Sequence, residues 1–357
     1  MSKKPIILGI ESSCDETAAA IITENNLNQP VILSNVVSSQ EEVHKKFGGV
    51  VPELAARSHL DKIDWIVEKA IKDSGINIKD IDGVAATAGP GLVVCLSVGL
   101  SFGKSFANTL NKPFMAINHL EGHALSPKLN SKLNYPYLLL LISGGHSQYL
   151  IVNGLGNYKR IGTTIDDALG EAFDKTAKLL GIEFPGGPQI EILAEKGDPE
   201  KFILPKPILN RGGCNLSFAG LKTAILKISK NIKSDQDKYD IAASFQKTIE
   251  EIMRKKTIIA FKEFKMKNES KKNTFVIAGG VAANKKLRKM FEEICDGHNF
   301  DAIFPPINLC GDNAAMIGLV GLEKYKSKLF DNLNFPANPR WQLDEKAIFL
   351  KGAGIKL

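Results

Sequence analysis

The stretch YLLLLISGGHSQYLIV, residues 137–152, decides the fold of this chain. Its apolar run from Tyr137 to Ile142 has the length of one buried strand, and a second run begins at Tyr149. Between the two runs, residues 143–147 read SGGHS, the small and polar residues of a tight turn. The segment therefore predicts a hairpin whose turn exposes backbone N–H groups to a phosphate or carboxylate ligand.

The beginning of the chain has the same pattern. Residues 6–22 read IILGIESSCDETAAAII, again a short apolar strand, a polar turn and a second strand. A third strand is expected after each hairpin, at 31–36 and 158–161, and helical and strand patterns alternate beyond it. The sequence therefore predicts an α/β fold of two similar halves, the layout expected of a nucleotide clamped between duplicated domains.

Length and composition agree with two domains. The 357 residues are too many for one ordinary core, and 44% hydrophobic with 24% charged residues is typical of a globular protein. No apolar run is long enough to cross a bilayer, and residues 1–5 lead into a short strand without the pattern of a signal peptide or a transit peptide, so we expect neither. The five cysteines are scattered and odd in number, which favours free thiols in a reducing cytosol. We therefore expect a cytoplasmic protein with no membrane partner.

Residues 119–123 read HLEGH, and in a helix the two histidines lie on one face, one turn apart. Two imidazoles at that spacing can share one metal ion, although HxxxH alone is a weak signal. Residues 310–318, CGDNAAMIG, place Asp312 just before an Ala-rich helix, where it is either an N-cap or a third metal ligand. Two histidines and one aspartate form a carboxylate facial triad, which suits iron(II) or zinc.

Three further segments have unusual compositions. The run at 276–284, VIAGGVAAN, predicts a strand, a glycine-rich loop and a helix start that turns its N–H groups toward an anion or a nucleotide. The helix within 166–175, DDALGEAFDK, lines up carboxylates on one side, where pairing with lysines is the simpler explanation. FPGGP, residues 184–188, predicts a rigid turn around flexible glycines.

Taken together, the motifs resemble the tRNA N6-adenosine threonylcarbamoyltransferase family from end to end, and its bacterial form most closely. The matching segments, in chain order, are GIESSCDET, GGVVPELAARSH, TAGPGL, HLEGH, SGGHSQ, DDALGEAFDKTAKLLG, FPGGP, LSFAGLKT, FQKTI, GGVAANKKLR and CGDNAAMIG. The resemblance implies the fold of the actin, sugar-kinase and heat-shock ATPase group, with two duplicated ribonuclease H-like α/β lobes and a ligand cleft between them. We expect an N-terminal lobe at 1–134, a C-terminal lobe at 135–327, and a tail at 328–357 that packs back on the first lobe.

The resemblance also implies the site residues. The metal ligands of the family match His119, His123 and Asp312. Its substrate-binding residues match Leu141, Ile142, Ser143, Gly144, Gly145, Asp174, Gly187 and Asn284. A further substrate contact, usually Asp in the family, is Glu191 here, which puts that contact in doubt. The family often has Thr where Gly311 stands, so the loop that carries Asp312 is expected to be looser.

The implied reaction transfers a threonylcarbamoyl group from threonylcarbamoyl-adenylate to N6 of the adenosine next to the tRNA anticodon, and releases AMP. Asp15 or Glu16 could take the N6 proton, although a structural role explains both equally well. The family implies two protein partners, a helper paralogue without the metal histidines and a small P-loop ATPase. The net charge of +7 is modest, and the expected phosphate contacts are Lys255, Lys256, Lys285, Lys286 and Arg288, unless these form only a solvated surface.

Two other functions remain open at this point. A metal-dependent peptidase also uses two histidines one turn apart, but its HExxH motif has Glu directly after the first histidine, where this chain has Leu120. A nucleotide-binding regulator of the same fold would need the hairpins without the metal ligands.

Overall fold

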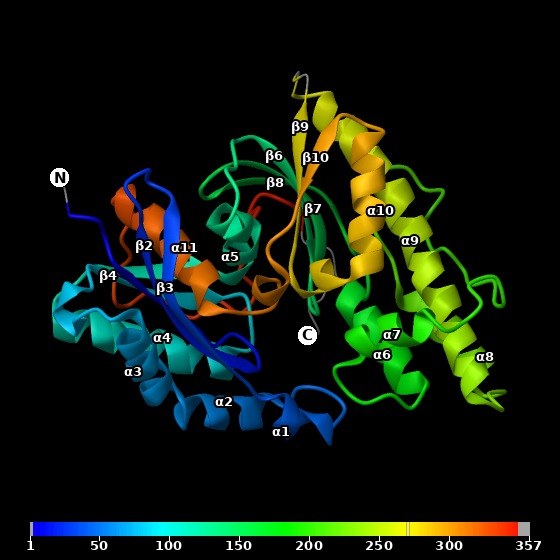
Figure 1. Ribbon diagram of the computed structural model, residues 1–357, viewed down its shortest axis with the longest axis horizontal. Helices are drawn as coiled ribbons and strands as arrows, with labels where there is room; N and C mark the ends of the chain where they lie inside the picture. The colour runs from blue at the N-terminus through cyan, green and yellow to red at the C-terminus, as the bar shows by residue number, and fades with distance from the viewer. Residues whose placement is uncertain (1–2, 269, 271, 349–357) are drawn as a thin grey trace. The chain divides into compact units, whose positions relative to one another are not determined.

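The structure is a computed structural model that describes residues 3–268, 270 and 272–348. The chain forms two compact units (Figure 1). The first consists of Met1–Leu133 and Gly311–Glu345, and the second of Asn134–Cys310 with the end of the chain from Lys346. Of the tail expected at 328–357, residues 328–345 belong to the first unit, and 349–357 lie outside the described residues.

The first unit is built on a mixed sheet with the order β3-β2-β1-β4-β5 within the described residues. The first three strands form the expected antiparallel meander, and β4 and β5 run parallel to β1. The strands are β1 (Ile7–Glu11), β2 (Glu16–Glu24), β3 (Pro30–Ser39), β4 (Gly83–Gly89) and β5 (Phe114–Asn118). The polar turn of ESSCDET thus joins β1 to β2 at one end of the sheet.

Helices cover this sheet: α3 packs on β2 and β3, α4 packs on β4, and α11 packs on β1, β2 and β4. The helices of this unit are α1 (Glu41–Lys45), α2 (Pro52–Leu60), α3 (Ile63–Ser74), α4 (Val93–Leu110), α5 (His119–Leu125) and α11 (Ala314–Lys326). By length and apolar composition alone, α4 could also cross a membrane, but core helices pass the same test. Here its buried face, which includes Leu96, Leu100 and Ala107, lies against the sheet.

The position of α11 corrects the expected lobe boundary at 327. Residues 311–327 were expected in the second lobe, whereas they belong to the first unit. A Cβ atom on Gly9 of β1 would lie 2.5 Å from the backbone nitrogen of Gly318 in α11. The two glycines therefore let helix and strand backbones approach each other more closely than any side chain would allow. This contact joins chain segments about 300 residues apart, which local patterns cannot reveal.

The second unit repeats the topology of the first. Its sheet has the order β10-β9-β6-β7-β8 within the described residues, with an antiparallel meander β6-β7-β8 and with β9 and β10 parallel to β6. The strands are β6 (Tyr137–Ile142), β7 (Ser147–Gly154), β8 (Asn157–Thr163), β9 (Asn273–Ala278) and β10 (Phe300–Ile303). Because the strand that opens each unit takes the same place in its sheet, the expected fold of two duplicated α/β lobes is confirmed.

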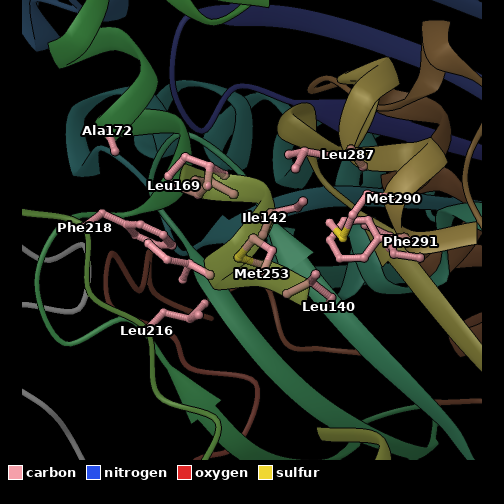
Figure 2. Packing of buried hydrophobic residues seen from close by; sticks show 14 of the residues in the cluster. Leu140, Ile142, Leu169, Ala172, Leu216, Phe218, Met253, Leu287, Met290 and Phe291 are labelled. Carbon is pink, nitrogen blue, oxygen red and sulfur yellow. The ribbon is translucent and has the colours of Figure 1, made fainter. Parts of the chain in front are cut away.

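The helices of the second unit are α6 (Leu169–Leu179), α7 (Gly186–Ala194), α8 (Ala219–Ser229), α9 (Asp235–Lys265) and α10 (Lys285–Asp296). Figure 2 shows how side chains of the sheet and the helices meet in one core. Leu140 and Ile142 of β6 lie among Met253 of α9, Leu287 of α10 and Leu169 of α6. The SGG turn after β6 and the starts of α6 and α10 are therefore all attached to elements that pack in the same core.

Candidate metal centre and ligand-binding loops

The two histidines of HLEGH lie on α5, which begins directly at the end of β5. The side chain of Asn118 starts the helix, because its Oδ1 accepts a hydrogen bond of 2.9 Å from the backbone nitrogen of Leu120. The small Gly122 faces α11, and a Cβ there would already lie 3.1 Å from Met316 and Ile317. The helix pair α5–α11 thus brings the histidines close to the residues that precede α11.

Asp312 lies opposite both imidazoles. Its Oδ1 is 3.1 Å from His123 Nε2 and 3.5 Å from His119 Nε2. One possible ligand atom from each of the three residues lies within 4.8 Å of the others, so the group can hold a metal ion. The N-cap of α11 is Asn313, whose Oδ1 accepts from the Met316 nitrogen at 3.1 Å. Asp312 is therefore not used as the helix cap, which was the competing interpretation of this residue.

His119 has a carboxylate behind it that the sequence analysis missed. Glu11 Oε2 lies 3.0 Å from His119 Nδ1, and Thr87 and the Ser13 backbone donate hydrogen bonds to the same carboxylate at 2.6 and 2.5 Å. A carboxylate only accepts, so Nδ1 carries a proton toward Glu11, and Nε2, which faces Asp312, is the ring atom that could bind a metal. Glu11 is fully buried at the end of an apolar strand, and this unusual position for a charge was the available signal.

The charges in this group stabilise one another. Burial acts to raise the pKa of Asp312, but the adjacent His119 and His123 outweigh it and lower that pKa. Burial also acts to raise the pKa of Glu11, but the adjacent His119 outweighs it and lowers that pKa. Both carboxylates are therefore ionised, as metal ligands and their supporting groups must be. Two imidazole nitrogens and a carboxylate oxygen fit a divalent transition metal ion.

His123 differs from its partner in its surroundings. It is completely buried, and its Nδ1 has no hydrogen-bond partner among the described residues. The hydrogen bond of this side chain is therefore made by Nε2, to Asp312 Oδ1.

Asp15 and Glu16 lie at the turn between β1 and β2, a few residues after Glu11. Burial, then the carboxylates of Asp312 and Asp15, raise the pKa of Glu16 well above its usual value. A cation held by Asp312 would offset that repulsion.

In the second unit, the SGG turn has open space above its backbone. Ser143 closes the turn through bonds from its nitrogen to the His146 carbonyl at 2.8 Å and from the His146 nitrogen to Ser143 Oγ at 3.1 Å. A Cβ on Gly144 or Gly145 would meet no atom within 4 Å. A Cβ on Gly170 in α6, in contrast, would lie 2.8 Å from Gly144 Cα, so the turn is seated on the start of α6. The preceding Leu141 and Ile142 are buried in β6.

The two glycines of FPGGP have different roles. Asp174 of α6 accepts a 2.9 Å hydrogen bond from the Gly186 nitrogen and so fastens the start of α7. A Cβ on Gly186 would lie 2.2 Å from the Cβ of Ala177, whereas one on Gly187 would approach only Phe173 Cβ, at 3.9 Å. Gly186 is thus needed for packing, and Gly187 leaves its backbone open to a ligand.

The start of α10, expected to face an anion, is already occupied by side chains. Asn284 Oδ1 accepts from the Leu287 nitrogen at 2.9 Å, and its amide donates to Gln246 at 3.1 Å. Glu191 Oε1 accepts from the Lys285 nitrogen at 2.6 Å and lies 3.4 Å from that of Lys286. The longer side chain of Glu191 therefore caps this helix, and any ligand contact would have to come from its other oxygen.

One of the five expected phosphate contacts is wrong. Lys256 is fully buried, and its Nζ donates to the carbonyls of Arg211 and Gly213 at 3.0 and 3.1 Å. Arg288 is half-buried and donates to the carbonyls of Ala282 and Pro305 at 2.6 and 2.8 Å, so it is already bound to loop backbone. The side chains of Lys255, Lys285 and Lys286 are exposed.

Comparisons with known proteins agree with this geometry. Residues 31–319 match the family model described as tRNA N6-adenosine threonylcarbamoyltransferase. The chain is 73% identical over 357 residues to the protein of that name from Pelagibacter ubique (strain HTCC1062), with 100% of both chains covered. It is 53% identical over 342 residues to the one from Rickettsia rickettsii (strain Sheila Smith), covering 95% of this chain and 98% of the relative.

Solved structures support the fold at low sequence identity. HypF from T. kodakarensis matches with a TM-score of 0.60 at 15% identity, covering 91% of this chain and 48% of that one. A full-length HypF with bound phosphate and nucleotide matches with a TM-score of 0.58 at 14% identity, covering 92% and 47%. These likenesses concern the fold alone. The close relatives are all named as transferases, which does not favour the peptidase or the regulator. The chain belongs to the tRNA N6-adenosine threonylcarbamoyltransferase family.

Proposed function

We propose that this chain transfers the threonylcarbamoyl group of threonylcarbamoyl-adenylate to N6 of the adenosine 3′-adjacent to the anticodon of tRNAs that read codons beginning with A. The N6 amine forms a bond to the carbamoyl carbonyl carbon, the bond from that carbon to the phosphate oxygen breaks, and AMP leaves. The amine gives up one proton. The observation that carries this proposal is the His119–His123–Asp312 group, in a chain that matches the transferase family over nearly its whole length.

The three ligands would hold one iron(II) or zinc ion. When bound, this ion would hold the threonylcarbamoyl oxygens and polarise the carbonyl as a Lewis acid. Glu11 orients the His119 ring, because its carboxylate accepts a hydrogen bond of 3.0 Å from Nδ1. Asp312 and His123 face each other at 3.1 Å, so little rearrangement is needed to bring both to one ion.

The adenylate would bind to the loops of the second unit. The open backbone of Gly144, Gly145 and Gly187 supports this role, because a ligand can approach N–H groups there without meeting a side chain. Leu141, Ile142 and Ser143 place the SGG turn. Asp174 holds the start of α7, next to Gly187, through the Gly186 nitrogen. Asn284 and the outer oxygen of Glu191 complete the proposed set.

Proton removal from N6 is assigned to the turn that follows Glu11. Both carboxylates of this turn, Asp15 and Glu16, are candidates for the general base. Asp15→Asn and Glu16→Gln, compared at equal metal content, separate the two.

The tRNA is a large polyanion whose anticodon-loop base can be presented unpaired. The exposed Lys255, Lys285 and Lys286 are the proposed phosphate contacts. With a net charge of only +7, the chain is expected to bind tRNA weakly alone and to act in the cytoplasm with a helper paralogue and a small P-loop ATPase.

One experiment tests the proposed function. The chain is incubated with threonylcarbamoyl-adenylate and unmodified tRNA, with and without the helper proteins, and the nucleosides are analysed by mass spectrometry. Threonylcarbamoyladenosine is the expected product, and a parallel peptide-cleavage assay should give none. Cleaved peptide without modified tRNA would contradict the proposal.

A further inference from the structure

A chain of buried polar side chains lies beside the turn that carries Asp15 and Glu16. It consists of His44 in α1, Gln40 at the start of α1 and His59 in α2, and we call it the Gln40 relay. All three side chains are at most 1% exposed. Neither the metal ligands nor the proposed adenylate contacts include them. Fully buried polar side chains are uncommon, so a group of three in contact needs an explanation.

The hydrogen bonds of the Gln40 relay all run in one direction. The Val51 nitrogen donates to His44 Nδ1 at 3.3 Å, which makes His44 Nε2 the donor to Gln40 Oε1 at 3.3 Å. The Gln40 amide then donates to His59 Nδ1 at 3.3 Å, and His59 Nε2 donates to the Cys14 carbonyl at 3.0 Å. Backbone N–H groups only donate and carbonyls only accept, so the two ends of the relay fix every donor and acceptor between them.

The relay ends on the turn between β1 and β2. His59 binds the Cys14 carbonyl, and the backbone nitrogen of Gln40 donates to the Asp15 carbonyl at 3.1 Å. Thr17 Oγ1 lies 2.7 Å from His59 Nδ1, which it can serve only as a donor. The turn is therefore held on both sides of Asp15 by the same few residues.

His59 must be a neutral ring with its proton on Nε2 for this arrangement to exist. Burial lowers the pKa of His59, which agrees with a neutral ring. Apolar side chains could fill the same volume, but they would make no hydrogen bonds to the turn. The polar side chains are consequently explained by the Cys14 carbonyl that His59 holds and by the hydrogen bonds through which Gln40 and His44 orient the His59 ring.

We propose that Gln40 and His59 are positioning residues for the transfer reaction. They act through the Cys14–Thr17 turn, which they fix through the Cys14 and Asp15 carbonyls, and so position the carboxylates of Asp15 and Glu16. This inference rests on the proposed role of that turn in removing the N6 proton. Residues of α1 and α2 would thus orient a proton acceptor that lies outside both helices.

The test compares His59→Leu, which removes the hydrogen bonds of the ring to Gln40, Thr17 and the Cys14 carbonyl, with His59→Gln, whose amide can still donate to the Cys14 carbonyl. Ser34→Ala is the matched control, because Ser34 Oγ also donates from a buried position to a carbonyl of the same unit, that of Ala70, at 2.6 Å. We expect His59→Leu to lower kcat on the order of tenfold or more, with the KM values and the metal content within about twofold of the parent. His59→Gln should recover most of the loss, and Ser34→Ala should keep the parent kcat.

A folded His59→Leu variant with the parent kcat would overturn the inference, and so would a loss that His59→Gln does not recover. If His59→Leu does not fold, Gln40→Glu replaces it, since a carboxylate cannot donate to His59 Nδ1. Gln40→Glu should then lower kcat and speed amide hydrogen exchange at Asp15 and Thr17, and parent behaviour in both would overturn the inference.

Separate variants test whether Asp15 or Glu16 is the proton acceptor. If Asp15→Asn and Glu16→Gln both keep the parent kcat, the turn is not the proton acceptor, and the inference falls with that proposal. If either is impaired while His59→Leu is not, the proposed base stands and the Gln40 relay alone is refuted. A nitrogen-15 spectrum that shows His59 protonated on Nδ1 would refute the relay directly.

Discussion

Glu11 and His119, 108 residues apart in the chain, meet inside the first unit, where Glu11 Oε2 lies 3.0 Å from His119 Nδ1. This contact turns His119 Nε2 toward Asp312, 3.5 Å away. The candidate metal centre therefore has a supporting carboxylate as well as three possible ligands. Its geometry is set by β1, α5 and the residues before α11, which all belong to the same unit.

Glu11→Gln should weaken metal binding without removing a ligand. The amide oxygen accepts a weaker hydrogen bond from His119 Nδ1 than the carboxylate does. Loss of such a supporting group lowers metal affinity on the order of 10- to 100-fold. Competition with a chelator measures the change. Glu53→Gln on α2 is the control, because Glu53 is exposed and pairs only with Arg57 among the interactions described for it. Equal affinity of Glu11→Gln and the parent would show that Glu11 does not support the centre.

Gly145→Val and Gly187→Val should lower adenylate affinity far more than they lower the melting temperature. Both positions have room for a side chain in the free protein, so the new atoms would occupy ligand space rather than core. Calorimetric titration with a non-hydrolysable adenylate analogue measures the affinity. Unchanged affinity in either variant would remove that glycine from the site.

Gly186→Val provides the contrast within the same turn. Its Cβ would lie 2.2 Å from that of Ala177, so the helices α6 and α7 must separate. We expect a loss of stability of about 1–3 kcal/mol, the usual cost of overpacking. Thermal unfolding measures it. A Gly186→Val variant as stable as the parent would contradict the assignment of this glycine to packing.

Reversing the charges of Lys285 and Lys286 together should raise the KM for tRNA and flatten its salt dependence, since two phosphate contacts would be lost. Adenylate affinity should barely change. The same reversal at two exposed lysines, Lys227 in α8 and Lys230 directly after it, controls for net charge. If both double variants behave alike at several salt concentrations, the start of α10 is only a solvated surface.

Local patterns predicted much of this protein. The two hairpins are marked by apolar runs around small polar turns, and the strand Tyr137–Ile142 has the predicted bounds. Residues 54–71 have the apolar spacing of one helix, but they form parts of two helices, α2 and α3, because the chain leaves the helical path at 61–62. The sequence pattern does not show this break, since Leu60 and Ile63 continue the apolar spacing.

Other features depend on contacts between distant segments. The packing of α11 on β1 depends on Gly9 and Gly318, and the burial of Lys256 depends on carbonyls more than 40 residues away. Glu191 reaches the start of α10 only because α7 and α10 lie together in the fold. In each case the side chain's role is set by a partner that sequence spacing does not identify.

The most direct test of the metal centre measures metal and product in the same samples. His119→Ala and His123→Ala are compared with the parent and with His298→Ala, a histidine of the second unit that contacts the Ile294 carbonyl. Elemental analysis gives the bound metal, and nucleoside mass spectrometry gives the threonylcarbamoyladenosine formed on tRNA. The parent and His298→Ala should carry about one metal ion per chain and form product, while the other two variants carry no metal and form none. A folded, metal-free His119→Ala variant with the parent's activity would contradict the account.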